Sequence, residues 1–362
     1  MLKKTKISKN ISIEGKEIGE GCPAYFIAEI GSNFDGDLDR AKELIFMAKE
    51  AGADAAKFQH YTANSLVSDS GFEKINSKYS HQSSWSESVY KTYENASLEA
   101  SWTKELKNTC EEAKITFLTS PYSFFLVDFV DQYVSAYKVG SGDITWIEII
   151  KHMASKKKPI ILATGASSMG DVHRAVSSIL EITPDIVLLQ CNTNYTANPE
   201  NFSHLQLNVI PEFKRKYPGI ITGLSDHMPG HVPVLGAVAL GASVIEKHFT
   251  DSNNRPGPDH SFAMNPESWR EMVDRVRELE LSLGDNCKKI EENEQNTAIV
   301  QRRSVCAAKS LSSGTRIKEQ DLTVLRPCPL DGIPPFELSS LIGKKLKRGV
   351  CHGEHIKREN LI

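Results

Sequence analysis

Eight short runs of apolar and β-branched residues, each followed by a segment with helical spacing, dominate the first 285 residues of the chain. In segment 38–49, for example, the apolar residues recur on one face of a helix. The predicted strands are residues 25–30, 55–59, 116–119, 136–139, 160–163, 187–190, 220–224 and 244–248. Eight consecutive strand–helix units over about 250 residues favour a closed (β/α)8 TIM barrel, an α/β fold, over an open sheet.

Polar or charged residues stand at the end of almost every predicted strand. In a (β/α)8 barrel the carboxyl ends of all strands meet at one mouth, where the active site lies. An open doubly wound sheet would instead focus its ligands at a single switch point. The strand-end residues are Glu29, Lys57, Gln59, Thr119, Ser120, Lys138, Ser141, Thr164, Gln190, Asn192, Ser225, Asp226, His227, Glu246 and His248. The sequence therefore predicts a polar site at the mouth of the barrel.

The connection after the second predicted strand, residues 60–100, is too long for an ordinary strand–helix loop of about 2–6 residues. It is rich in serine and aromatic residues. This composition predicts a lid over the barrel mouth or a contact between subunits.

A small basic domain is predicted at residues 301–362, separated from a barrel of residues 1–285 by a charged linker at 286–300. A charged helix end fits that linker equally well. The tail holds 12 basic against 6 acidic residues, a formal charge of +6, whereas the first 300 residues carry −9. It also repeats Gly-x-x-Ile-Lys-x-x-(Asp/Asn)-Leu at 314–322 and 353–361. These features predict a pseudo-symmetric domain of short strands and turns that docks on an acidic surface.

The overall composition excludes several classes of protein. A net charge of −3 gives no reason to expect binding to nucleic acid or to a membrane surface. No apolar run approaches the length of a membrane span, and no apolar stretch behind the N-terminal lysines suggests a signal peptide. The seven cysteines are scattered and include no Cys-x-x-Cys pair, which argues against disulfides and zinc clusters. We therefore expect a cytoplasmic protein.

Two histidines end neighbouring strands, His227 on the seventh and His248 on the eighth, and Glu29 on the first strand is next around the ring. Imidazole and carboxylate suit a divalent ion such as Mn, Fe, Co, Ni or Zn. Alternatively, each histidine caps a local hydrogen-bond network. Glu246 shares the pleat face of His248 and is a candidate base, whereas Lys247 is expected to face the helices.

Lys57 and Gln59 share one pleat face, and Lys138 ends the fourth strand. Two lysines that converge on the barrel mouth suit a substrate with both a carboxylate and a phosphate. The main alternative is a Schiff base on Lys57 or Lys138, as in a pyruvate aldolase.

Two further segments favour a carbohydrate substrate. Residues 255–260 are dense in proline and glycine, which fixes a loop that places Asp259 for a sugar hydroxyl, although a simple turn has the same composition. Residues 192–195 offer hydrogen-bonding groups next to the ring of Tyr195.

The motifs together resemble those of the sialic acid synthase family, which condenses phosphoenolpyruvate with amino sugars to nonulosonates. The matching segments, in chain order, are residues 28–33, 57–59, 137–143, 223–227, 246–250 and 255–259. The tail is similar to the antifreeze-like (SAF) domain of that family, so the resemblance covers nearly the full chain. It implies C–C bond formation between phosphoenolpyruvate and an open-chain N-acylated mannosamine-type sugar, with water attacking C2 and phosphate leaving.

The resemblance also implies roles for single residues. The catalytic set is Glu29, Asp143 and Glu246, with Glu29 acting on the attacking water. Phosphoenolpyruvate is held by Lys57, Thr119, Lys138, Ser141 and Ser225. The sugar is contacted by Gln59, Thr193, Tyr195, Asp259 and, from the partner in a domain-swapped homodimer, Arg326. His227 and His248 bind a divalent metal, Mn2+ or else Mg2+ or Co2+.

Three positions depart from the pattern of the N-acetylneuraminate-forming members: Ala163 for serine, Thr193 for asparagine and Asp143 for glutamate. These changes leave the sugar open between N-acetylmannosamine and a 2,4-diacetamido-trideoxy hexose, the precursor of legionaminate- or pseudaminate-like products. A third hypothesis, from another class, is a non-catalytic carbohydrate-binding protein that carries a SAF-like tail.

Overall fold

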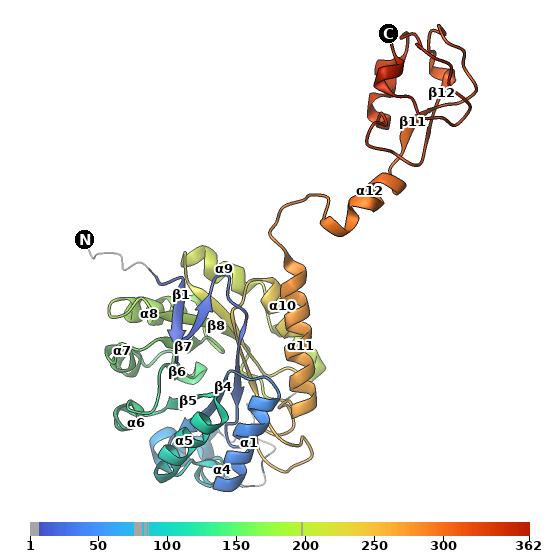
Figure 1. The fold of residues 1–362 in the computed structure, drawn as a ribbon. Coiled ribbons are helices and arrows are strands. Elements are labelled where there is room, and N and C mark those ends of the chain that lie inside the picture. Colours follow the sequence, from blue (N-terminus) through green and yellow to red (C-terminus); the bar gives the residue numbers. More distant parts are fainter. Residues whose placement is uncertain (1–6, 76–81, 83–84, 86, 197) are drawn as a thin grey trace. The chain divides into compact units, whose positions relative to one another are not determined.

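Eight parallel strands form the centre of the larger of two units in the computed structural model, which describes residues 7–75, 82, 85, 87–196 and 198–362 (Figure 1). The strands are β3 (Tyr25–Glu29), β4 (Ala55–His60), β5 (Thr116–Pro121), β6 (Tyr137–Val139), β7 (Ile160–Ala163), β8 (Ile186–Cys191), β9 (Ile221–Asp226) and β10 (Val244–His248). They pair in parallel in the order β5-β4-β3-β10-β9-β8-β7-β6, and β5 also contacts β6. The predicted (β/α)8 barrel is thereby confirmed.

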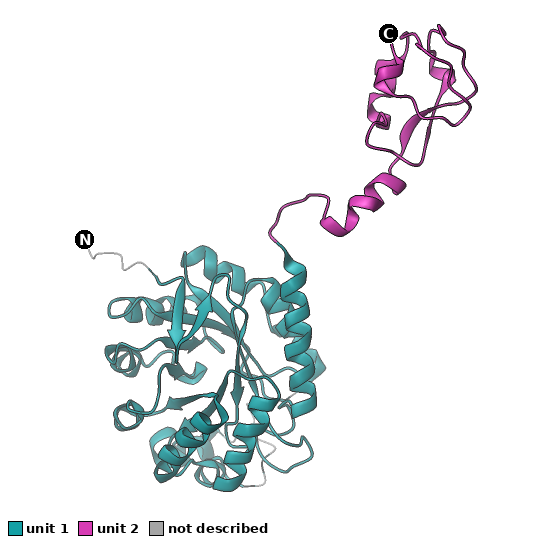
Figure 2. Cartoon of the chain, viewed as in Figure 1, with its two compact units in different colours: residues 1–284 teal, residues 285–362 magenta. Residues whose placement is uncertain are grey.

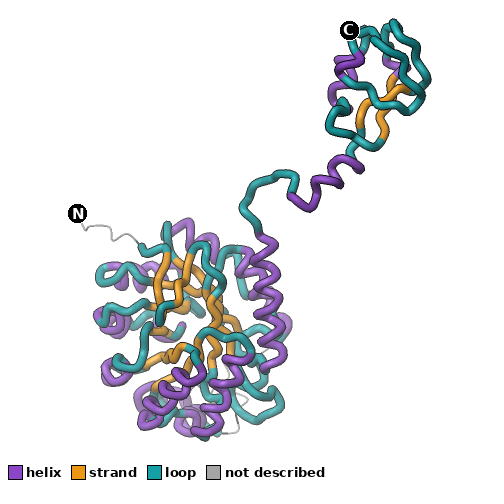
Figure 3. Tube along the Cα trace, viewed as in Figure 1, coloured by secondary structure: helices purple, strands orange, loops and turns teal. Residues whose placement is uncertain are grey.

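Helices cover the outside of the strands in the first unit (Figure 3). They are α1 (Leu38–Glu50), α5 (Thr103–Ala113), α6 (Phe124–Val130), α7 (Ile147–Ser155), α8 (Met169–Leu180), α9 (Val209–Lys216), α10 (Val232–Ala239) and α11 (Pro266–Leu283). Polar caps start several of them: Asp37 accepts from the first turn of α1, and Ser168 does so on α8. Within the described ranges, no helix is long and apolar enough to cross a membrane.

A hairpin that the sequence analysis did not predict closes the barrel at the amino ends of its strands. Strands β1 (Asn10–Ile13) and β2 (Lys16–Gly19) pair antiparallel. Their apolar side chains join one buried cluster with residues at the starts of the barrel strands, such as Tyr25 and Val244. Ile13 is fully buried there. The hairpin therefore plugs the amino end of the barrel and leaves the carboxyl end open.

The described part of the long connection between β4 and α5 contains three short helices. They are α2 (Ala63–Leu66), α3 (Asp69–Ile75) and α4 (Val89–Ala96), followed by the single turn η2 (Ala100–Trp102). Part of the predicted insertion, residues 76–81, 83–84 and 86, lies outside the described residues.

The first unit comprises Met1–Gly284 and the second Asp285–Ile362 (Figure 2). In the predicted linker, residues 286–300, the structure has the turn η5 (Glu292–Glu294) and most of helix α12 (Gln295–Gln301).

The second unit is a small domain of short strands and turns. Strands β11 (Ser304–Ala307) and β12 (Leu322–Leu325) pair antiparallel, and the turns are η6 (Glu319–Asp321), η7 (Pro335–Leu341) and η8 (Arg358–Asn360). The two copies of the sequence repeat have equivalent structures. Gly314 and Gly353 both adopt a positive φ, and Ile317 and Ile356 are both buried. The repeat thus supplies two matching parts of one core.

We expect Ile13→Ala to lower the free energy of unfolding of the first unit by about 2–5 kcal/mol, because it opens a cavity in the barrel plug. Ser12→Ala, on the exposed face of the same strand, changes it by less than about 0.5 kcal/mol. All four tryptophans lie in the first unit, so their fluorescence in urea measures its unfolding. Equal stabilities of the two variants would contradict the role of the hairpin.

Candidate active site at the mouth of the barrel

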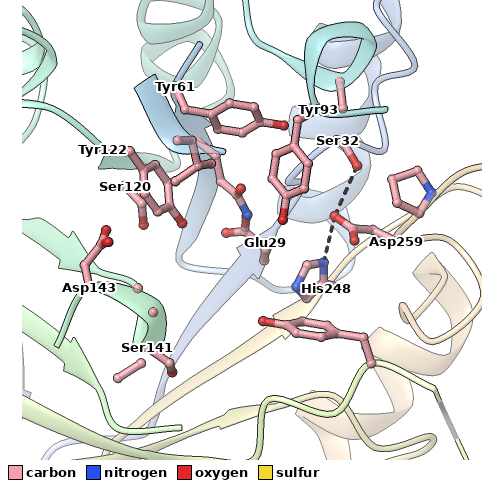
Figure 4. A pocket seen from close by; sticks show the side chains of 18 of the residues that line it. Glu29, Ser32, Tyr61, Tyr93, Ser120, Tyr122, Ser141, Asp143, His248 and Asp259 are labelled. Atoms are coloured by element: carbon pink, nitrogen blue, oxygen red, sulfur yellow. Dashed lines mark hydrogen bonds and ion pairs between the residues drawn. The ribbon is translucent and has the colours of Figure 1, made fainter. Parts of the chain in front are cut away.

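A cavity of about 450 Å3 opens at the carboxyl ends of the strands (Figure 4). Twelve of the fifteen predicted site residues line it. These twelve are Glu29, Lys57, Gln59, Lys138, Ser141, Asp143, Tyr195, Ser225, His227, Glu246, His248 and Asp259. The structure therefore brings together residues that are up to 230 positions apart in the chain.

The register of the parallel strands explains this convergence. Glu29 at the end of β3 stands beside Lys57 on one neighbouring strand and beside His248 on the other. In the same way Ser225 on β9 stands beside Glu246 on β10. Because neighbouring positions of parallel strands point to the same face, this belt of side chains faces the barrel interior.

Two lysines and two glutamates form a buried charge cluster on the cavity floor. Lys57 is ion-paired with Glu29, and Lys138 Nζ lies 3.3 Å from Glu246 Oε1. Lys57 Nζ also lies 4.0 Å from Glu246 Oε2. All four side chains are at least nine-tenths buried. The interaction of each ammonium with a carboxylate offsets the cost of removing both from water.

Neutral side chains complete the hydrogen bonding of the two glutamates. Gln59 Nε2 donates to Glu29 Oε1 at 2.8 Å, and the Ser225 hydroxyl donates to Glu246 Oε1 at 3.1 Å. Oε2 of Glu29 is the oxygen that pairs with Lys57 Nζ, whereas Oε2 of Glu246 makes no hydrogen bond within the described structure and lies 4.0 Å from Lys57 Nζ. Glu246 therefore keeps an acceptor atom for a further donor.

The interpretation of the lysines as a cationic pocket needs correction. Each lysine is already paired with a carboxylate, and the described lining also contains Asp143 and Asp259. Four carboxylates thus face two lysines in this cavity. The sequence placed the lysines correctly, but the acidic partners on the same pleat face cancel their charge.

Burial and neighbouring charges give the carboxyl groups of the cavity different pKa values. Burial raises the pKa of Glu29 to about 7, although Lys57 opposes the shift. Glu246 behaves differently, because the charges of Lys138 and Lys57 outweigh burial and lower its pKa. Burial also raises the pKa of Asp143 to about 6. Among these three carboxyl groups, Glu29 has the pKa closest to neutral pH, followed by Asp143.

The two predicted metal ligands lie next to each other, with ring centroids 5.4 Å apart. Burial lowers the pKa of His227 to about 4 and that of His248 to about 3, so both imidazoles are neutral at pH 7. His227 Nδ1 lies 2.8 Å from the Asn192 carbonyl oxygen and donates to it in the tautomer that leaves Nε2 free. His248 Nδ1 is buried and makes no hydrogen bond within the described residues, although Asp259 Oδ2 lies 3.6 Å away.

These observations fit a divalent metal ion. Neutral imidazole with a free lone pair is the form that binds metals. A cap on a local network, the alternative reading, accounts for Nδ1 of His227, whereas Nδ1 of His248 makes no hydrogen bond in the described structure and has Asp259 Oδ2 3.6 Å away. No group of three or more His, Cys, Asp or Glu residues with metal-binding geometry occurs in the described part of the chain. The protein would therefore supply two ligands, and substrate or water the others.

Side chains on the outer face of the sheet fix the ends of β9 and β10, the strands that lead to His227 and His248. Lys247 Nζ lies 2.5 Å from Asp226 Oδ2 and 2.6 Å from the Met228 carbonyl oxygen, and both charged groups are fully buried. Lys247 lies outside the cavity lining, on the opposite pleat face from Glu246 and His248. This ion pair joins the ends of β9 and β10, which carry the two imidazoles.

The loop that carries Asp259 is fixed by charged contacts. Arg40 makes two hydrogen bonds to Asp251, at 2.8 and 2.6 Å, and Arg255 binds the same carboxylate. Ser32 donates to Asp259 Oδ2 at 3.1 Å. A side chain at Gly31 would begin 2.9 Å from that oxygen, and Gly31 has a φ of +54°. The loop is thus anchored over the mouth, as its composition predicted.

Thr119 was predicted in the site and does not line the cavity. Its hydroxyl contacts the Phe58 carbonyl oxygen at 3.1 Å and the His60 ring at 2.7 Å, on the outer side of β5. Ser120 lines the cavity instead, because it stands beside the inward-facing Gln59. A register shift of one residue exchanges the two faces of a strand.

The other two predicted residues lie elsewhere. Thr193 is half-buried beside Gly165 and is not part of the cavity lining. Arg326 belongs to the second unit, where its side chain is exposed.

Aromatic side chains form one wall of the cavity. The wall, defined as Tyr61, Phe72, Trp85, Tyr93 and Tyr122, comes from the insertion after β4 and from the residue that follows β5. The composition of residues 60–100 predicted a lid over the mouth or a contact between subunits, but no periodic pattern showed which of these side chains line the cavity.

Comparison with known proteins gives the following relationships. A sequence profile of the NeuB family matches residues 44–288, and one of the SAF domain matches residues 302–361. The N,N'-diacetyllegionaminic acid synthase of Legionella pneumophila is 33% identical, over 98% of this chain and 99% of that protein. The N-acetylneuraminate-9-phosphate synthase of Homo sapiens is also 33% identical, over 95% and 94%. The crystal structure of an N-acetylneuraminic acid synthetase from Leptospira borgpetersenii, with citrate, matches with a TM-score of 0.69 at 27% identity, over 81% of this chain and 96% of that one.

Two substitutions on β5 distinguish the two faces of the strand. Thr119→Val removes a partner of the buried His60, so we expect a loss of about 1–3 kcal/mol in the free energy of unfolding. Ser120→Ala removes a cavity hydroxyl 3.5 Å from Lys57 Nζ, so we expect the anionic ligand predicted from the sequence, phosphoenolpyruvate, to bind about threefold to tenfold more weakly. Calorimetric titration measures the second effect. The reverse pattern would contradict the assignment of faces.

Proposed function

This chain belongs to the NeuB family, and on that premise we propose that it condenses phosphoenolpyruvate with the open-chain form of an N-acylated mannosamine-type sugar. The products are a nine-carbon 2-keto acid and phosphate. The observation that carries the proposal is the buried cluster of Lys57, Lys138, Glu29 and Glu246 beneath two neutral histidines. Three relatives named above are synthases of such acids.

Lys57 and Lys138 bind the anionic groups of phosphoenolpyruvate, with the hydroxyls of Ser120, Ser141 and Ser225 as further donors. All five line the cavity. The described lining contains four carboxylates and two lysines. A trianionic substrate therefore needs additional positive charge in the cavity. A metal ion and a guanidinium group meet this requirement.

Glu29 handles the proton of the attacking water. With a pKa near 7, it takes this proton as the water oxygen bonds to C2 of the pyruvyl unit. C3 bonds to the sugar aldehyde carbon, and the C2–O bond to phosphate breaks. The proton taken by Glu29 balances the one gained by the aldehyde oxygen as it becomes a hydroxyl, and the second proton of the water leaves with the phosphate as C2 becomes the keto carbon. Gln59 orients Glu29 for this task.

His227 and His248 hold a divalent metal ion in this proposal, Mn2+ in preference to Mg2+ or Co2+. When bound, the ion polarises the sugar aldehyde. The support for the assignment is the neutral state of both rings, their adjacency and the absence of a hydrogen bond to His248 Nδ1 among the described residues.

A Schiff-base aldolase is less compatible with the floor of the cavity. Such an enzyme needs a neutral amine as nucleophile. Burial favours neutral Lys57, but the charges of Glu246 and Glu29 outweigh it and raise its pKa. The Lys57 amine therefore stays protonated and ion-paired. A carbohydrate-binding protein without activity would not need buried charges on the floor of its pocket.

We further propose that the active enzyme is a cytoplasmic homodimer in which Arg326 of the partner subunit completes the sugar site. Three observations support this arrangement: the charge of +6 on the tail, the acidic cavity lining and the exposure of Arg326. All seven cysteines are free thiols, in accordance with a reducing compartment.

Enzyme supplied with phosphoenolpyruvate, Mn2+ and N-acetylmannosamine or its trideoxy diacetamido analogue is expected to release phosphate. Removal of the metal with a chelator, or His248→Ala, lowers the rate about 100-fold or more, since a Lewis acid contributes several kcal/mol. His204→Ala, which changes an exposed histidine of the same unit, is the control. Release that survives chelation would remove the metal from the mechanism, and borohydride trapping of pyruvate on a lysine would favour the aldolase.

Coexpression of Arg326→Ala with Lys57→Met tests the partner contribution. Each variant alone is expected to be inactive. If Arg326 acts across the dimer, half of the randomly mixed dimers have one complete site, so about a quarter of the wild-type activity returns. Arg302→Ala, another exposed arginine of the second unit, serves as the control. Absence of recovery in purified mixed dimers would show that Arg326 acts within its own chain or not at all.

A further inference from the structure

A buried histidine ties the loop that carries Asp259 to the loop after β3. His260, the residue after Asp259, is 1% exposed, whereas residues 254–257 of the same loop are exposed. The ring atom Nδ1 of His260 lies 2.7 Å from Thr250 Oγ1, and Nε2 lies 2.9 Å from Asp35 Oδ1. Thr250 stands just after β10, and Asp35 lies between β3 and α1. One ring therefore bridges the start of its own loop and the loop after the neighbouring strand.

The two contacts of this ring have defined directions. An ionised carboxylate only accepts hydrogen bonds, so Nε2 of His260 donates its proton to Asp35. In the neutral ring Nδ1 is then an acceptor, and the Thr250 hydroxyl donates to it. The chain Thr250–His260–Asp35 has the order of a catalytic triad. Thr250 is nevertheless fully buried and does not line the cavity, so it has no access to a substrate. The contacts of the ring hold backbone segments together.

The backbone around His260 is fixed as well. Asn253 Nδ2 donates to the carbonyl oxygen of His260 at 2.9 Å and to that of Ala263 at 2.6 Å. A side chain at Gly257 would begin 2.6 Å from ring atom Cδ2 of His260, so only glycine lets the loop cross the ring this closely. Asp259 is therefore one peptide bond away from a residue that is held through both its ring and its carbonyl oxygen.

The loop after β3 contacts Asp259 and His260 together. Ser32 donates to Asp259 Oδ2 at 3.1 Å, and Figure 4 shows this contact next to His248. Asp35, three residues further along, accepts from the His260 ring through Oδ1. Its other oxygen, Oδ2, lies 3.3 Å from Arg40 Nε. Arg40 in turn anchors the start of the Asp259 loop, so both ends of this loop are tied to the same neighbour.

We propose that His260 is a positioning residue, whose two side-chain contacts hold the Asp259 carboxylate in place for the sugar. The inference rests on the proposed function and on the predicted contact between Asp259 and the sugar. A carboxylate that is held before the sugar binds loses little freedom on binding, which strengthens the contact. Neither Thr250 nor Asp35 lines the cavity, so the ring acts on the sugar through Asp259 and leaves the phosphoenolpyruvate site unchanged.

Steady-state kinetics of His260→Leu, which removes both ring contacts with a side chain of similar size, test this role. Phosphate release from phosphoenolpyruvate is measured with N-acetylmannosamine, or with its trideoxy diacetamido analogue where only that sugar reacts. We expect kcat/KM for the sugar to fall about tenfold or more, because a charged hydrogen bond is misplaced. The KM for phosphoenolpyruvate should stay within about twofold.

The outcomes separate the inference from the function on which it rests. An active wild-type enzyme combined with no loss for the sugar in His260→Leu, or with equal losses for both substrates, would overturn the inference alone. Absence of release by the wild-type enzyme with either sugar would overturn the proposed function, and the inference with it.

Asp37→Ala is the matched control for a loss of stability. Asp37 is exposed in the same loop as Asp35, and it caps α1 by accepting from the backbone N–H groups of Asp39 and Arg40. The substitution weakens the start of α1 without touching the ring, so kcat/KM for the sugar should stay within about twofold. A loss as large as that of His260→Leu would show that general destabilisation explains both, and would contradict the positioning role.

Asp35→Gly keeps the inference testable if His260→Leu does not fold. It removes the carboxylate partner of the ring from an exposed position whose φ of +52° suits glycine. We expect kcat/KM for the sugar to fall about threefold or more, and an unchanged value would contradict the inference. Where both variants fold, the double variant should lose no more than His260→Leu alone, because both changes break the same contact. Losses that multiply would show two independent effects and count against the bridge.

Discussion

The alternation of side chains along eight parallel strands is the constraint on which this structure depends. One face of each strand points into the barrel and the other toward the helices, so consecutive residues have different tasks. Glu246 and His248 face the cavity, whereas Lys247 between them pairs with Asp226 behind the sheet. The inner set makes the site, and the outer set fixes the strand ends that carry it. A shift of one residue would exchange the two sets.

Within that frame, the paired charges of the floor determine what the site can bind. Isolated buried charges would cost several kcal/mol each, so Lys57 and Lys138 are retained only with Glu29 and Glu246 beside them. The same burial raises the pKa of Glu29 toward neutrality, where a carboxyl group can exchange a proton during a reaction. An anionic substrate then competes with the glutamates for the lysines. The ion pairs that stabilise the buried charges in the absence of substrate are therefore the same contacts that an anionic substrate must rearrange before it can react.

The sequence predicted the structure correctly where apolar residues recur with the spacing of a strand or a helix. Hydrophobic runs located all eight barrel strands, and their polar ends located most of the cavity lining. Thr119 and Ser120 could not be separated, because both are small and polar and only the register with Gln59 decides which one faces inward. The charge of the pocket was misjudged because pairing between Lys57 and Glu29 is a property of neighbouring strands. The aromatic residues of the wall have no regular spacing in the sequence, because they lie on short helices and loops. No pattern therefore showed which of them face the cavity.

The floor and the wall of the cavity differ in how strongly their residues depend on one another. Floor residues such as Lys57 and Glu29 are coupled through buried contacts between strands, so a change at one position unsettles the others. The insertion carries its part of the wall, including Tyr93 on the short helix α4, outside the paired strands of the barrel. Relatives about one-third identical to this chain are named for different acids. The energetics favour variation in the wall over variation in the floor, because loop segments tolerate change better than paired buried charges.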